Sequence, residues 1–196
     1  LHVRKGVFIP MKSISIRKKR HTSQFSQNLL LSGICFLLCL LLPILSDHTN
    51  LLSPSLRLSH IPVLLCGFLC GWPYGLAVGF LSSLLRGLLF SIPLVPDCLS
   101  LATELAAYGA MAGLMYHFLP KRLDSLYTAL VISMITGRVL WGVTRLIFSL
   151  FGAPALTLEA FWSYAVTSGI PGIFLSLLVV PLLILAVQQI HFINRH

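Results

Sequence analysis

Six hydrophobic stretches, separated by proline, glycine and charged residues, follow residue 28 of the chain. A helix needs about 20 mostly apolar residues to cross a bilayer, and most of these stretches approach that length. The second covers only about 18 Å at 1.5 Å per residue, so we expect a partial span or a start nearer Leu56. The pattern predicts an all-α, polytopic membrane protein whose membrane domain, residues 29–190, is a six-transmembrane-helix bundle. The predicted spans are residues 29–45, 61–71, 75–91, 99–119, 126–151 and 168–190.

The composition is also typical of an integral membrane protein. Hydrophobic residues make up 57% of the 196 residues, charged residues only 10%, and the mean hydropathy is +0.91. A chain of this composition would not stay soluble as a globular domain.

The formal net charge of +9 is concentrated in a basic N-terminal segment, residues 1–28. Half of the 14 lysines and arginines precede residue 21. We interpret this segment as a cytoplasmic anchor that binds anionic membrane lipid, and we therefore expect no nucleic-acid partner. Its basic residues are Arg4, Lys5, Lys12, Arg17, Lys18, Lys19 and Arg20.

Basic residues outside the predicted spans are placed asymmetrically. With a cytoplasmic N-terminus, Lys121, Arg122 and Arg195 also lie on the cytoplasmic side, and only Arg57 lies outside. This bias predicts a multi-pass protein of the cell (plasma) membrane with both termini cytoplasmic, so that residues 191–196 form a cytoplasmic tail.

Four ionisable side chains lie inside the predicted spans: Arg86, Glu104, Arg138 and Arg145. Each costs on the order of 2.5 to 3.5 kcal/mol at the centre of a bilayer, so together they indicate a polar interior site. Counted along the helices, three of them lie about 8 to 9 Å below the outer surface, and Arg138 lies about 20 Å below it. One alternative is a structural ion pair of Glu104 with Arg86 or Arg145. Even one such pair leaves two arginines unpartnered, and this excess favours an anionic solute group such as a carboxylate.

Aromatic and acidic neighbours extend this predicted site. Tyr108 follows Glu104 by one helical turn, and Trp141 shares a helical face with two of the arginines. We therefore predict substrate binding by Arg86, Asp97, Glu104, Tyr108, Arg138, Trp141 and Arg145.

The outer loops contain residues with two possible roles. Asp97, Trp162 and Tyr164 lie in loops that could cover a bound solute, and for the two aromatic residues the alternative is an anchor at headgroup level. His60 is either a contact at the outer rim or a helix cap.

Small residues recur at every fourth position between Gly67 and Gly87. Such spacing lets helices approach closely, which favours packing of the second predicted helix against the third; docking of other helices is the alternative. Pro73 interrupts the pattern and predicts a tight cytoplasmic turn at residues 72–74. The helix-packing or docking residues are Gly67, Gly71, Gly75 and Gly79.

The chain lacks the motifs of common enzyme classes. No Gly-x-x-x-x-Gly-Lys-Ser/Thr loop occurs, so ATP hydrolysis would need another subunit. Neither Gly-x-Ser-x-Gly nor a zincin pair of histidines occurs, so we do not expect an enzyme. Cys35/Cys39 and Cys66/Cys70 have no companion histidine cluster, so we expect neither a metal site nor a cofactor.

Two segments of the chain resemble a known family. Residues 60–79, HIPVLLCGFLCGWPYGLAVG, followed by Leu84, Leu85 and Arg86, and residues 104–116, ELAAYGAMAGLMY, are similar to the substrate-binding S component of energy-coupling-factor (ECF) vitamin transporters. The resemblance implies a six-helix subunit that captures a vitamin from outside and then topples in the membrane on an ECF module. That module consists of a transmembrane T component and two ATPase subunits. Docking in this family often uses an Ala-x-x-x-Ala motif on the first helix, where this chain has Ser32, Gly33, Cys35 and Cys39 as its small residues.

The most similar branch of that family is the pantothenate type. The resemblance therefore implies a high-affinity solute-binding subunit of an ATP-driven uptake transporter for a small, carboxylate-bearing vitamin such as pantothenate. Pyridoxine, hydroxymethylpyrimidine or another vitamin or precursor is an alternative solute. A non-transport membrane assembly or scaffold protein is an alternative function.

Overall fold

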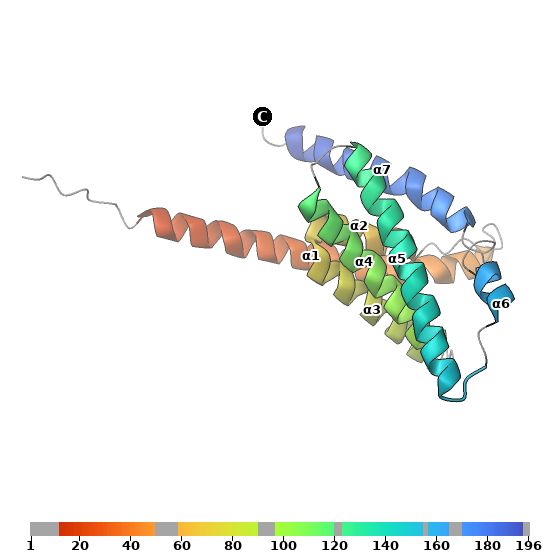
Figure 1. Ribbon diagram of the computed structural model, residues 1–196. Coiled ribbons are helices and arrows are strands. Elements are labelled where there is room, and N and C mark those ends of the chain that lie inside the picture. The colour runs from red at the N-terminus through yellow and green to blue at the C-terminus, as the bar shows by residue number, and fades with distance from the viewer. Residues whose placement is uncertain are drawn as a thin grey trace, which may run out of the picture.

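The computed structural model describes residues 12–49, 59–89, 97–119, 123–154, 157–164 and 170–193, and helices are its only regular structure there (Figure 1). Six long helices match the six predicted stretches, which confirms the all-α bundle. A short additional helix, α6, lies between the last two. The helices are α1 (Lys12–Thr49), α2 (His60–Cys70), α3 (Trp72–Leu89), α4 (Leu99–Phe118), α5 (Leu123–Leu150), α6 (Leu158–Trp162) and α7 (Ile170–Ile193).

The lengths and surfaces of these helices suit a membrane. Segments Phe25–Pro43 of α1 and Asp124–Leu150 of α5 are each long and apolar enough to cross a bilayer, and α2 and α7 contain shorter apolar segments. Large apolar side chains such as Leu30, Ile135 and Leu178 are exposed on the outside of the bundle. An apolar surface of this extent is typical of contact with lipid rather than with water.

The first helix begins well before the predicted span. In α1 the helix starts at Lys12, and its N-terminal half extends away from the other helices (Figure 1). Arg4 and Lys5 of the predicted basic anchor lie outside the described residues. Farther along α1, Ser32, Cys35 and Cys39 are buried at a spacing of three to four residues, so they form the face that packs on the bundle.

The connection between α2 and α3 is a single residue. Gly71 has a φ of +98°, a conformation that glycine adopts without steric cost. The predicted turn at residues 72–74 is wrong in position, since the chain turns at Gly71 instead. Trp72 already begins α3, and Pro73 lies in the first turn of that helix. Proline is well suited to a first turn, where its missing N–H has no intrahelical partner and its φ is already helical.

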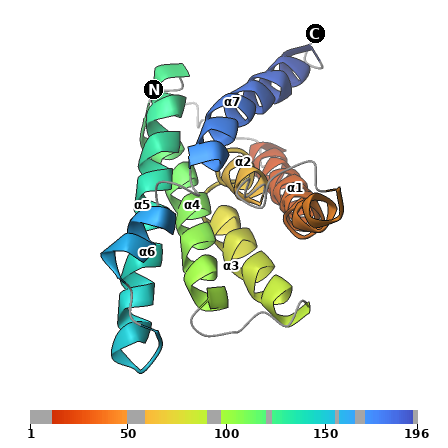
Figure 2. The ribbon, with the colours of Figure 1, turned by 90° about the vertical axis from the view of Figure 1, so that its right-hand side faces the viewer.

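Glycines also bring α4 into backbone contact with α2 and α3. A Cβ atom added to Gly67 or Gly75 would overlap the backbone of Gly109, and one added to Gly79 would overlap the backbone of Leu105. The predicted glycine pattern therefore lies against α4 as well as at the junction of α2 with α3. Figure 2 shows the result, with α4 lying between α3 and α5.

Candidate functional site

The crossing of α4 and α5 determines which polar side chains meet. Thr103 Oγ1 of α4 lies 3.1 Å from Thr144 Oγ1 of α5. The backbone carbonyl of Glu104 lies against Gly137, so Glu104 is beside the stretch of α5 that carries Arg138 and Trp141. Two groups of side chains follow from this register, one buried between the helices and one lining a cavity.

The buried group is centred on the carboxylate of Glu104, which has no exposed surface. The Tyr108 hydroxyl donates a hydrogen bond of 2.6 Å to Oε1, and the Tyr164 hydroxyl donates one of 2.7 Å to Oε2. Arg138 Nη1 lies 3.1 Å from Oε1, which gives an ion pair buried in the bundle. A buried carboxylate is stable only with such partners, and Glu104 has them from three separate segments of the chain.

His60, the first residue of α2, adjoins this group. Only 2% of it is exposed, its Nε2 lies 3.9 Å from Glu104 Oε1, and its ring meets the Tyr108 ring edge-on at 4.9 Å. His60 therefore lies in the interior of the bundle. The interpretation of His60 as a contact at the outer rim is wrong.

The second group lines what we call the polar cavity, a space of about 210 Å³ between α3, α4, α5 and the segment after α6. Within it Arg145 Nη1 lies 2.8 Å from Asp97 Oδ1, and half of the Asp97 side chain is exposed. Two guanidinium groups and one carboxylate line the cavity. The lining residues are Ser83, Arg86, Gly87, Asp97, Cys98, Leu101, Trp141, Arg145 and Tyr164.

Cys98 is one of the residues that line the polar cavity. Its Sγ donates to the carbonyl of Ser83 at 3.4 Å, and it contacts Gly87, where a Cβ would overlap the sulfur. Burial raises the pKa of the Cys98 thiol, so this lining residue is uncharged at neutral pH.

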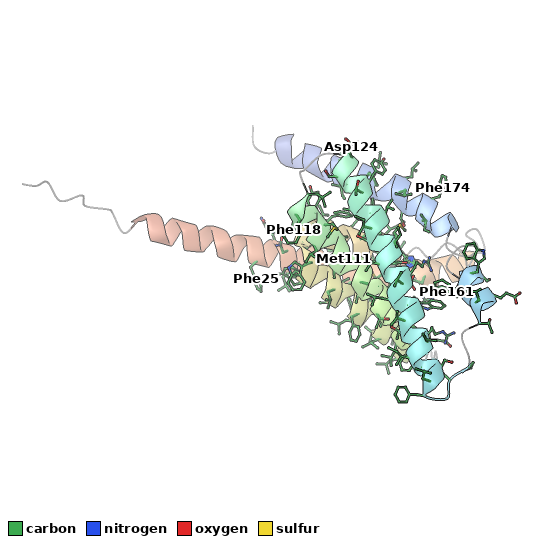
Figure 3. All side chains as sticks on the ribbon, in the orientation of Figure 1. Phe25, Met111, Phe118, Asp124, Phe161 and Phe174 are labelled. Carbon is green, nitrogen blue, oxygen red and sulfur yellow. The ribbon has the colours of Figure 1, made fainter. Side chains whose placement is uncertain are left out.

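Two stacked rings separate the polar cavity from the buried group. The Trp141 and Tyr164 rings are almost parallel, at 2°, with centroids 3.6 Å apart. Phe161 of α6, labelled in Figure 3, stacks on Trp141 at 6.2 Å and packs against Gly142 of α5. These contacts seat α6 on α5 and thereby place Tyr164, which lies just beyond α6. Trp162, in contrast, is largely exposed and does not line the cavity.

The structure thus divides the predicted site residues into two sets. Arg86, Asp97, Trp141 and Arg145 line the polar cavity, whereas Glu104, Tyr108 and Arg138 belong to the buried group.

The alternative of an ion pair of Glu104 with Arg86 or Arg145 is wrong in its partner. Glu104 pairs with Arg138, whereas the depths counted from the sequence suggested Arg86 or Arg145. Those depths counted residues along each helix and ignored both the crossing register and the reach of an arginine side chain, which is about one helical turn. The expectation of two unpartnered arginines is also wrong, because Arg145 pairs with Asp97.

Sequence reasoning did not place Tyr164 in the site. It offered this residue as a loop aromatic that covers a solute or anchors at headgroup level, and neither role includes a bond to Glu104. The local signal was the buried carboxylate itself, whose two oxygens can accept hydrogen bonds from several donors.

The match of the chain to known families decides its identity. The model of the family described as "ECF transporter, substrate-specific component" matches residues 29–184, which is most of the chain. The chain belongs to this family. The resemblance found in the sequence is thereby confirmed. No curated protein and no solved structure matches the chain significantly.

Membership explains the main features of the fold. S components are helical membrane proteins that provide the substrate specificity of an ECF transporter, and their partners are a small-molecule substrate and an ECF module. The apolar outer surface and the charged cavity inside the bundle are the two features that such a subunit needs.

Proposed function

We propose that this S component is the high-affinity solute-binding subunit of an ATP-driven vitamin uptake transporter, and that it takes a small anionic vitamin from the extracellular side. The observation that carries the proposal is the presence of two guanidinium groups, Arg86 and Arg145, in the lining of the polar cavity. A guanidinium group matches the planar geometry of a carboxylate and binds it through charge-assisted hydrogen bonds.

The size of the polar cavity supports a small solute. Its 210 Å³ lies below the roughly 300 to 1,000 Å³ that is typical of pockets for drug-sized ligands. Its walls combine the aromatic surface of Trp141 and the apolar Leu101 with a few charged groups, as expected for a site that orients an amphiphilic molecule.

The buried group has a supporting role in this proposal. Both carboxylate oxygens of Glu104 already accept hydrogen bonds from tyrosine hydroxyls, so Glu104 holds α4 and the segment after α6 in place rather than binding the solute anion. Arg138, on the same helix as Trp141, is fixed by the same carboxylate. The group therefore positions the aromatic wall of the cavity.

The remaining parts of the proposal come from the sequence and the family. The positive-inside bias supports a plasma-membrane protein with both termini cytoplasmic, which puts the polar cavity on the extracellular side. In this proposal two ATPase subunits hydrolyse ATP, and a T component joins them to the S component. The chain itself is not an enzyme. Among the anionic vitamins, pantothenate is the candidate suggested by sequence; pyridoxine and hydroxymethylpyrimidine are the alternatives.

A scaffold function has less support. It would use the glycine pattern to dock other helices, but Gly67, Gly75 and Gly79 are covered by α4 within the same chain. That surface is not free to bind another protein.

The test is a thermal-shift screen of the purified S component against vitamins and carboxylate-bearing precursors. A solute at 100 times its dissociation constant should stabilise the protein by about 2.7 kcal/mol. Arg145→Ala should abolish the shift, whereas Arg20→Ala, on the N-terminal extension of α1, should leave it unchanged. Absence of a shift with every compound in the unmodified protein would contradict the proposal.

A further inference from the structure

The junction of α2 with α3 borders a second cavity, which we call the junction cavity. It has a volume of about 370 Å³ and lies between the end of α2, the link at Gly71, the start of α3 and the last two turns of α4. It shares no lining residue with the polar cavity. The ends of membrane-spanning helices lie close to the lipid head groups, and the positive-inside bias puts these ends on the cytoplasmic side.

Aromatic side chains form part of the wall of the junction cavity. Phe68 of α2 and Tyr116 of α4 meet edge-to-face, with ring planes at 90° and centroids 5.4 Å apart, so the two rings form a corner. Trp72, the first residue of α3, also lines the cavity and is 48% exposed. The faces of such rings are electron-rich and attract a cation.

The end of α2 contributes backbone carbonyl groups to the same wall. The last carbonyls of a helix have no partner within the helix, and they form the negative end of its dipole. The Gly71 N–H donates to the carbonyl of Gly67 at 3.1 Å. Leu69 differs, because the residue four positions later is Pro73, which has no N–H. The usual backbone donor for the Leu69 carbonyl is therefore missing at this cavity.

The charges of the wall favour a cation as ligand. Among the described residues that line the junction cavity there is no lysine, arginine, aspartate or glutamate. An anion would meet electron-rich ring faces and the negative end of α2. A primary ammonium group is attracted by both, and its three N–H donors match carbonyl acceptors.

We propose that the junction cavity binds the ammonium head group of a membrane phospholipid, and that it prefers phosphatidylethanolamine. The membrane presents such head groups at the level of the helix ends, where a half-exposed tryptophan such as Trp72 is typical. A quaternary ammonium group also binds ring faces but has no N–H for a carbonyl, so phosphatidylcholine should bind less well. This site is separate from the solute site. Only its assignment to the cytoplasmic leaflet rests on the proposed topology.

The experiment is a competition between three phospholipids with identical acyl chains: phosphatidylethanolamine, phosphatidylcholine and phosphatidylglycerol. The purified full chain is equilibrated with equal amounts of the three in detergent, and the lipids that stay bound are counted by native mass spectrometry. We expect retention to fall in that order. Phosphatidylethanolamine should exceed phosphatidylglycerol about tenfold, the effect of one desolvated cation–π contact.

Two variants test the place of binding independently. Trp72→Leu removes one aromatic face, and the tenfold preference should fall to about twofold or less, whereas Trp72→Phe should keep most of it. His117→Lys puts a fixed positive charge at the exposed part of the wall and should remove the preference by repulsion. The matched control is Trp162→Leu, an exposed tryptophan of α6 outside the cavity, which should preserve the tenfold ratio.

A soluble head group distinguishes a lipid from a free cation. Glycerophosphoethanolamine, which has no acyl chains, should fail to displace the bound lipid at equal concentration, and equal competition would overturn the assignment to a lipid. A preference that survives both Trp72→Leu and His117→Lys would overturn the assignment to this cavity. Equal retention of the three lipids by the unmodified chain would also overturn the proposal, and it is the result expected if a segment of a protein partner fills the cavity instead.

Discussion

The two faces of α4 differ in the way they contact their neighbours. Toward α2 and α3, Gly109 and the glycines opposite it allow the backbones to touch, so no side chain separates the helices. Toward α5, the large side chains of Glu104 and Tyr108 fill the space, and they are joined by charge and hydrogen bonds. Close backbone packing gives a rigid contact with no room for chemistry. Contact through polar side chains joins α4 to α5 by a charge pair and hydrogen bonds, and these bonds position the aromatic wall of the polar cavity.

The difference teaches how one helix serves two purposes. Small residues in α4 face the helices that must stay fixed relative to it, and polar residues face the side on which the polar cavity lies. The contact of α4 with α2 and α3 depends on the close fit of the backbones. The contact of α4 with α5 depends on charge pairing and hydrogen bonds between side chains. The predictions below separate these two dependences.

The largest expected effect is on the buried ion pair. Arg138→Met leaves the Glu104 carboxylate without its cation, and the free energy of unfolding should fall by about 3 to 5 kcal/mol. Replacing both partners, Glu104→Gln with Arg138→Met, should restore most of this loss, because no unpaired charge remains. The measurement is denaturant unfolding in detergent. A double variant as unstable as the single one would show that the pair itself is not the source of the loss.

The glycine contact should respond to a single added methyl group. Gly109→Ala puts a Cβ into the backbone of Gly75, which cannot move away as a side chain could, and should cost about 1 to 3 kcal/mol of stability. Gly33→Ala on α1 is the control, since nothing lies within 4 Å of a Cβ there. Thermal unfolding of both variants under one set of conditions measures the difference. Equal melting temperatures would refute the close backbone contact.

The smallest expected effect on stability is at the half-exposed ion pair of the polar cavity. Asp97→Asn should change the free energy of unfolding by less than about 1 kcal/mol, because water screens this pair. Affinity for a carboxylate solute should nevertheless rise severalfold, since Asp97 competes with the solute for Arg145. Glu159→Gln on α6 is the matched control and should alter neither quantity. Weaker binding after Asp97→Asn would instead mean that Asp97 contacts the solute directly.

Much of the fold could be predicted from sequence because it depends on local patterns. Runs of apolar residues predicted the six main helices, and glycine at intervals of four residues indicated close helix contacts. The error at residues 72–74 has a local cause as well. Proline ends a helix when it lies inside one but begins a helix when it lies in the first turn, and the sequence alone did not distinguish these positions.

The candidate site was harder to predict, because it depends on how helices cross. Counting residues from the end of each span put Glu104 level with Arg145, whereas the contact of its backbone carbonyl with Gly137 of α5 places it beside Arg138. Tyr164 comes from a connection whose path no periodicity fixes. Its bond to Glu104 joins residues 60 positions apart in the chain.

The single-residue link at Gly71 has a mechanical consequence. Two helices joined by one residue have no slack between them, so α2 cannot slide along its axis without carrying α3 with it. Because both backbones are also packed against α4, we expect the three helices to move as one rigid unit. A displacement of α2 or α3 near Gly71 would therefore also move the part of α3 that lines the polar cavity. That part carries Ser83, Arg86 and Gly87.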